Sequence, residues 1–326
     1  MIDAAGPWGT GPFEVKDGTS TLEKRAPVVT LAPNKNYWNK DRMAKATFKF
    51  DNVISKQEAI EEVMKGGKMH IVTELLPQEA KQVEKSKHAK VVKNDAKTIL
   101  VGVFNQNSPN SKWTDVNLRK AANLAVDRKA VLKDGGMGYG TIHPSFIQKG
   151  QFGYNSSLKP YGHKPDEAKK ALNAAGVKEI TIVAGEGHKG VVDALAKNFE
   201  AVGVKVNKDM SGAPKGDKWD IWLVEHFDGS PNYPMGVVFR EFFGDSGGFR
   251  KMKNDTKFEG LQTKVLATTG DKEQGKLMQE MDKYVYDNAN VLFLCSPAKL
   301  YAVSNKVNFV PYDTTVLELV ESGWKK

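Results

Sequence analysis

Hydrophobic and polar positions follow two different periods along the chain, and together these periods predict an α/β fold. Residues 46–54 alternate apolar and polar side chains, as a half-buried strand does. Residues 56–67 instead place apolar side chains three and four positions apart and end in two glycines, which predicts an amphipathic helix capped by Ser55. The first third of the chain also predicts a lysine-rich helix within 81–97 and strands over 9–15, 28–33, 69–75 and 99–105.

The most regular unit lies in the middle of the chain. Residues 180–184 form an apolar strand, 190–203 an amphipathic helix and 204–207 a second strand. This is a βαβ pattern, so we expect parallel strands joined by a right-handed crossover. Further helices are expected over 165–176 and 272–287, and further strands over 219–225, 291–296 and 299–304.

A polar, turn-rich loop after Asn105 leads into a helix of small residues that Thr114 or Asp115 caps. Arg119 and Arg128 are expected to stay at the edges of this helix, because long cationic side chains keep their charge in water. The loop over 135–165 is long enough to predict a functional segment or one that wraps a lobe.

Composition places the chain among globular proteins of about two domains. It has 326 residues, of which 40% are apolar and 27% charged. No apolar run approaches the roughly 18 residues that cross a bilayer. Cys295 is the only cysteine, so the sequence predicts no internal disulfide and no Cys-x-x-Cys zinc site, and a buried inert thiol is expected.

The net charge of +9 is spread along the chain, with its densest run at 81–97. Acidic residues interrupt this run and it contains no aromatic side chain on which a base would stack. The pattern therefore predicts a solvated helix face and no nucleic-acid partner.

One motif keeps a nucleotide-dependent enzyme open as an alternative. Residues 185–190, GEGHKG, fit the G-x-G-x-x-G pattern between a strand and a helix, and Asp209 follows about 20 residues later. Such glycines let a backbone approach a pyrophosphate at a helix N-terminus. However, only one mononucleotide-binding half is visible, and turn glycines are common without a ligand. The alternative function is an NAD(P)-dependent enzyme.

The preferred binding site lies where the strand over 219–225 ends. Ligands gather outside the carboxyl ends of strands in open α/β sheets, and this end offers carboxylates, an imidazole and aromatic faces. The predicted ligand-binding residues there are Glu225, His226, Phe227, Asp228, Asn232 and Tyr233. An ordinary polar loop at a strand end is the other interpretation.

Catalytic and metal motifs are not found in the sequence. The six histidines show no metal-binding spacing, and no G-x-S-x-G nucleophile motif occurs. Residues 244–248, GDSGG, lack the histidine and aspartate contexts of a serine protease. We therefore predict no catalytic residue, no metal site and no cofactor.

Several motifs in order resemble one family, the bacterial extracellular solute-binding proteins of the peptide, opine and nickel class (family 5), which serve ABC transporters. The resemblance rests on GTGPFEV at 9–15, NKNYWNK at 34–40, the segment 48–72, FNQNSPNSKWTDVNLRKAANLAVDR at 104–128 and YGHKPDEAKKALNAAG at 161–176. The segment 291–312 is similar to nickel-type members in particular. His70 departs from the aspartate usual at its position.

This resemblance implies a two-lobe α/β fold of the periplasmic-binding-protein type (type II, cluster C-like). Residues 1–105 with the tail 299–326 would form lobe one, and residues 106–298 lobe two. The chain is similar to the C-terminal two thirds of such a protein, so we expect the N-terminal part of lobe one to be lacking. Asn105 and Asn107 would lie near the crossing between lobes, where their amides can face the cleft. Asn105, Asn107 and Trp38 are therefore further candidate ligand contacts. Both asparagines are equally well explained as turn formers.

The resemblance further implies a non-catalytic function. A peptide, metal chelate or similar small solute would be captured in a cleft between the lobes and delivered to the permease of an ABC transporter, in the periplasm or outside the cell. Asp228 or Glu225 would hold an amine, and His226 would suit a metal chelate. A third interpretation is a structural or accessory subunit, with an incomplete cleft, that associates with a larger assembly.

Overall fold

The chain divides into two units, and the described backbone passes between them in two places. The computed structural model describes residues 9–18, 24–95, 97–226, 235–311 and 317–325. Unit 1 holds the chain up to Asn94 and again from Lys299, and unit 2 runs from Asp95 to Ala298. Each unit has its own sheets and its own buried core.

Unit 1 is built from short antiparallel sheets and helices. Its strands are β1 (Phe13–Asp17), β2 (Val28–Pro33), β3 (Phe48–Asp51), β4 (Ile71–Val72), β5 (Ala89–Asn94), β12 (Lys299–Ser304), β13 (Val307–Asn308) and β14 (Gly323–Trp324). Its helices are α1 (Lys56–Lys65), α2 (Pro77–Val83) and the 3-10 turn η1 (Lys40–Arg42). The sheet orders are β1-β2-β3, β4-β12-β5 and β13-β14.

The core of unit 1 forms around β12, which lies between β4 and β5. Successive side chains of a strand point to opposite faces, and Leu300 to Val303 are all buried, so β12 is covered on both faces. Tyr301 and Val303 share a cluster with Phe48 and Phe50 of β3. This packing joins the two larger sheets of unit 1.

The first predicted helix is confirmed, and the lysine-rich helix is wrong in part. The Ser55 side chain caps α1 by accepting from the Glu58 amide, and Gly66 ends the helix in the left-handed conformation. In contrast, the run 81–97 contains only the last turn of α2 and then forms β5. Exposed lysines solvate the open side of a strand as well as the outer side of a helix, so the charge pattern does not distinguish the two.

Unit 2 contains the larger sheet. Its strands are β6 (Ile99–Phe104), β7 (Gly140–Thr141), β8 (Glu179–Val183), β9 (Lys205–Asp209), β10 (Ile221–His226) and β11 (Val291–Pro297). Its longer helices are α3 (Val116–Ala125), α5 (Pro165–Ala174), α6 (Lys189–Ala201), α7 (Met235–Phe243), α8 (Thr256–Ala267) and α9 (Asp271–Asp287). Short helical turns are η2 (Lys112–Thr114), α4 (Arg128–Ala130), the π-helical η3 (Val131–Gly135) and η4 (Glu186–His188).

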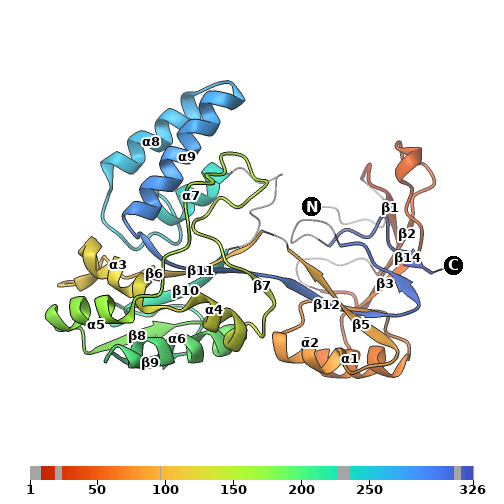
Figure 1. Cartoon of the computed structure of the whole chain (residues 1–326). Coiled ribbons are helices and arrows are strands. Elements are labelled where there is room, and N and C mark those ends of the chain that lie inside the picture. Colours follow the sequence, from red (N-terminus) through yellow and green to blue (C-terminus); the bar gives the residue numbers. More distant parts are fainter. Residues whose placement is uncertain (1–8, 19–23, 96, 227–234, 312–316, 326) are drawn as a thin grey trace. The chain divides into compact units, whose positions relative to one another are not determined.

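Helices cover both faces of the unit 2 sheet, whose order is β7-β11-β6-β10-β8-β9 (Figure 1). One face packs on α3, α5 and α6 through a cluster that includes Leu100, Leu223 and Phe199. The other face packs on α7, α8 and α9 through Val101, Phe293 and several phenylalanines of these helices. Helices α7 and α8 were not predicted from the pattern.

The predicted βαβ unit is confirmed, since β8 pairs in parallel with β9 across α6. Strand β10 also pairs in parallel with β8, whereas β6 runs antiparallel to both β10 and β11. Because β6 pairs only within this sheet, the unit boundary precedes it, one strand before the boundary expected near residue 105.

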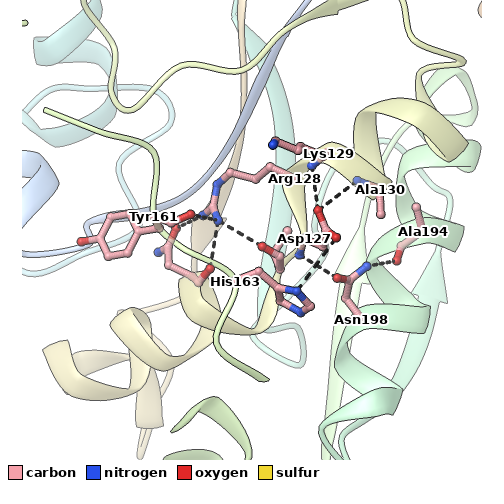
Figure 2. A network of polar contacts seen from close by, with 10 residues as sticks. Asp127, Arg128, Lys129, Ala130, Tyr161, His163, Ala194 and Asn198 are labelled. Carbon is pink, nitrogen blue, oxygen red and sulfur yellow. Dashed lines mark hydrogen bonds and ion pairs between the residues drawn. The ribbon is translucent and has the colours of Figure 1, made fainter. Parts of the chain in front are cut away.

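The expectation that Arg119 and Arg128 stay at helix edges is wrong. Each is only 5% exposed. The Arg128 guanidinium donates to the Phe293 carbonyl at 2.7 Å. It also donates to the Tyr161 carbonyl at 3.2 Å, near the Asp127 cap (Figure 2). Arg119 likewise donates to the Ala289 carbonyl at 3.1 Å. Burial lowers the pKa of Arg128 to about 10, but the carbonyls satisfy its donors, so both arginines fasten helix ends to loops and to β11.

Candidate functional site

The candidate site lies at the carboxyl ends of the parallel strands of unit 2. Strands β8, β9 and β10 run in the same direction and end at Val183, Asp209 and His226. Backbone topology therefore gathers the segments that follow these strands along one edge of the sheet. This is the edge at which open α/β sheets bind ligands.

A carboxylate and an imidazole, which lie far apart in the sequence, form a hydrogen-bonded pair at this edge. The Glu225 carboxylate lies on β10, and His188 ends the turn η4 within the glycine motif. The Glu225 Oε2 atom is 3.0 Å from His188 Nε2, and their side chains are 21% and 22% exposed. The pair is thus largely buried, which weakens the screening of its interaction by solvent.

The face of Glu225 is fixed by strand pairing. Both Glu225 and Cys295 pair with Leu100 of β6, so the three side chains lie in one row across the sheet. Burial, and to a smaller extent the charge of Glu225, raises the pKa of the Cys295 thiol to about 12. The expected burial of the thiol is confirmed, and Cys295 lies in the same row of the sheet as Glu225.

His226 points to the opposite face of the sheet from Glu225, as neighbours on a strand must. It is 3% exposed, and its ring lies 5.4 Å from the ring centroids of Phe242 and of Phe249. These aromatic surroundings favour a packing role for His226. The structure therefore does not bring the imidazole of His226 together with the Glu225 carboxylate.

The other predicted contacts are distributed as follows. Phe227, Asp228, Asn232 and Tyr233 lie outside the described residues. Trp38 belongs to unit 1, where its side chain is 73% exposed and its ring is 5.6 Å from that of Tyr37.

Asn105 lies at the other end of the unit 2 sheet. It follows β6, which is antiparallel to β10, so Phe104 pairs with Ile221 while Ile99 pairs with His226. The Asn105 side-chain amide donates to the carbonyls of Asp217 at 3.0 Å and Trp219 at 2.9 Å, and its oxygen accepts from the Ser108 amide. Asn105 is 3% exposed, whereas Asn107 is exposed. Asn105 therefore ties the loop after β6 to the segment before β10.

Two hollows open beside Asn105. The larger has a volume of about 560 Å³ and the smaller about 190 Å³, and Asn105 lines both. Asp220 at this end accepts from the indole N–H of Trp113 and from the Thr181 amide, each at 2.8 Å. The Asp220–Trp113 pair was not singled out from the sequence, because the two positions are 107 residues apart and share no local pattern.

The last glycine of the motif, Gly190, has a packing explanation. A Cβ atom at Gly190 would lie 2.8 Å from the Gly135 carbonyl oxygen, and one at Gly135 would lie 2.7 Å from the Val191 Cα. Only glycine allows this approach between η3 and α6. Asp209, the acid of the expected fingerprint, caps its own turn, and its hydrogen bonds with Ser211 lower its pKa.

Metal clusters and membrane spans were sought over the residues that the structure describes. Within them, no group of three or more His, Cys, Asp or Glu side chains is arranged to hold a metal ion. No helix in the same ranges is long and apolar enough to cross a membrane.

The fold is that of solved binding proteins. NikA from Staphylococcus aureus, in complex with Ni(L-His)2, aligns with a TM-score of 0.74 at 17% identity over 99% of this chain and 72% of that chain. NikA from Brucella suis, in complex with Fe(III)-EDTA, aligns with a TM-score of 0.80 at 16% identity over 97% of this chain and 68% of that chain. The predicted two-lobe, periplasmic-binding-protein-like α/β fold is confirmed.

The family is also established from the sequence. The model described as "Bacterial extracellular solute-binding proteins, family 5 Middle" matches residues 3–248, and the chain belongs to this family. "Heme-binding protein A" of Haemophilus influenzae is 22% identical over 97% of this chain, and "Di/tripeptide-binding protein 3" of Pseudomonas aeruginosa is 25% identical over 54%. The chain spans 58% of the first of these relatives and the alignment covers 31% of the second.

Proposed function

We propose that this protein binds a small solute without catalysis and delivers it to the permease of an ABC transporter outside the cytoplasmic membrane. Membership of a family of extracellular solute-binding proteins supports the general function. Capture by closure of two lobes, which the family resemblance implies, is part of this proposal.

The observation that carries the proposed site is the Glu225–His188 pair at the carboxyl ends of β8 and β10. A half-buried carboxylate attracts a cation more strongly than an exposed one, because less water screens it. An ionised carboxylate offers about four lone-pair positions, so it accepts from His188 and from a ligand amine together. Asp228 and its neighbours after β10 complete the proposed site from the sequence.

The proposed ligand class is a solute with a protonated amine, such as a short peptide. A relative carries the name "Di/tripeptide-binding protein 3", and a solved DppA of Helicobacter pylori, with a TM-score of 0.71, holds the peptide STSA. A metal–amino acid chelate would present similar groups, as in the Ni(L-His)2 complex of NikA. The burial of His226 among phenylalanines gives no support to direct ligation of a metal by that residue.

Calorimetric titration with di- and tripeptides, Ni(L-His)2 and haem tests the proposal. For a ligand with an amine, we expect Glu225→Gln to weaken Kd about tenfold, because a hydrogen bond to a charged group contributes about 1.5–3 kcal/mol. Asp228→Ala should weaken it by a similar factor. The matched control is Asp209→Asn, which alters an acid at the neighbouring strand end that is engaged with its own turn.

Other outcomes would contradict the proposed site or favour one of the alternative functions. Unchanged affinity in both Glu225→Gln and Asp228→Ala would remove this edge of the sheet from the binding site. Native mass spectrometry of the purified protein distinguishes the two alternative functions. A bound NAD would favour the enzyme, and a stable protein partner without any solute would favour the accessory subunit.

A further inference from the structure

The backbone crosses between the units at two short stretches. The chain passes from unit 1 to unit 2 at Asn94–Asp95 and returns at Ala298–Lys299. Within unit 1, Asn94 pairs with Lys299 as the first rung of the β5–β12 ladder. Within unit 2, the β6–β11 ladder reaches Leu100 opposite Cys295. On the return side, Ser296 and Pro297 of β11 pair with β7, so a single residue, Ala298, separates β11 from β12.

Side chains of unit 2 hold one end of these stretches. The Thr98 hydroxyl donates to the Pro297 carbonyl at 3.1 Å and so ties one crossing stretch to the other. The Gln148 amide nitrogen Nε2 donates to the Lys97 carbonyl at 3.2 Å and to the Thr98 carbonyl at 3.0 Å. Thr98 and Gln148 are 0% and 1% exposed, so water does not replace these bonds easily.

Lys97 is held in a conformation that it would not choose by itself. Its φ angle is +56°, in the left-handed region that side chains other than glycine and asparagine seldom occupy. Such a residue persists only where its surroundings impose the conformation. The contact from Gln148 to its carbonyl is one such constraint, because it fixes the peptide plane that follows Lys97.

The loop that carries Gln148 is anchored on the helical face of unit 2. The backbone N–H of Gln148 donates to Gln151 Oε1 at 2.7 Å. Three residues earlier, the Ser145 hydroxyl donates to the Asp282 carboxylate of α9 at 2.6 Å. Between them, the ring of Phe146 contacts that of Phe242 at 5.1 Å between centroids. Gln148 therefore reaches the crossing from a support that is fixed in unit 2.

We propose that Gln148 is a latch that holds the Lys97–Thr98 backbone and thereby confines bending between the units to the few residues at each crossing. Without the latch, Lys97 leaves the left-handed region and the unit 2 end of both crossing stretches loosens. The latch would serve solute capture by keeping closure on one path, and in this respect it rests on the proposed function. Its test uses no ligand.

The experiment measures distances between nitroxide labels at Val53 of unit 1 and Leu266 of unit 2, each 72% exposed, by pulsed electron resonance. The labels replace cysteines introduced at these positions in a Cys295→Ala background. Gln148→Leu keeps similar bulk and removes the amide donors. We expect its distance distribution to be about twice as wide as that of the parent, because more orientations of the units are populated.

The matched control is Gln274→Leu, since Gln274 on α9 also donates to two carbonyls, those of Val265 and Thr268, far along the chain from either crossing. Equal widening by both substitutions, or no widening by Gln148→Leu in a folded protein, would overturn the latch. If Gln148→Leu does not fold, Thr98→Val replaces it, with a smaller widening expected and an unchanged width counting against the proposal. A wider distribution together with no binding of any solute would reject only the proposed function.

Discussion

Strand β10 has a carboxylate near each of its ends, and the two carboxylates have different surroundings. Asp220, just before the strand, accepts from the Trp113 indole and the Thr181 amide, and both bonds lie within the fold of unit 2. Glu225, near the other end, faces His188 at 3.0 Å with about a fifth of each side chain exposed. An acid whose two oxygens accept from the fold serves the structure, whereas the proposed role of Glu225 is to bind a solute.

A third acid, Asp282, is more deeply buried than either Asp220 or Glu225. Asp282 on α9 is 0% exposed, and burial raises its pKa to about 7 although Ser145 and Phe146 donate to it. The native protein therefore binds a proton between about pH 4 and 7 that the unfolded chain releases, so the free energy of unfolding falls as pH rises through this window. Between pH 5 and pH 8, Asp282→Asn should remove roughly 3 kcal/mol of this pH dependence.

Urea denaturation at pH 5 and pH 8 measures the effect of Asp282. The parent protein should lose more stability than Asp282→Asn between these two values. Parallel pH profiles for the two proteins would show that Asp282 does not titrate in this window. Glu225→Gln supplies the control, because this acid lies outside the buried contacts of Asp282 and about a fifth of its side chain is exposed.

Asp220→Ala is expected to have the next largest effect. It leaves the Trp113 N–H and the Thr181 amide without their acceptor, and a buried donor left unsatisfied costs about 1–3 kcal/mol. We expect a loss of about 2 kcal/mol in unfolding free energy, measured in urea. Solute affinity should stay within about twofold of the parent, since this residue lies at the opposite end of β10.

Glu225→Gln should show the reverse pattern, with a stability change below about 1 kcal/mol and the loss confined to solute binding. Equal destabilisation by Asp220→Ala and Glu225→Gln would mean that both acids are structural. The distinction between the two ends of β10 would then disappear.

Local patterns in the sequence were sufficient for much of the fold. Ser55 and the double glycine mark α1, and the apolar periods mark the β8–α6–β9 unit, because caps and periods are properties of neighbouring residues. The pattern failed where tertiary contacts decide. Arg128 is buried because carbonyls from three other segments converge on it, and no local signal announces them.

The candidate site was predictable in the same uneven way. Glu225 was identified because it stands at the carboxyl end of an apolar strand, and such an end is a feature of sequence order. Its partner His188 lies 37 residues earlier and was singled out only as part of a glycine motif. Asn105 was placed near the lobe crossing, but its partners Asp217 and Trp219 are more than 100 residues away, and they hold it at the other end of the sheet.

Hydrogen–deuterium exchange with and without a solute found by calorimetry is the most direct test of where the ligand binds. The account predicts slower exchange in peptides covering residues 184–189 and 221–234, and unchanged exchange in peptides covering 105–113. Slower exchange confined to 105–113 and 216–220, beside the larger hollow that Asn105 lines, would contradict the account. Binding would then lie at the Asp220 end of β10 and not at the Glu225 end.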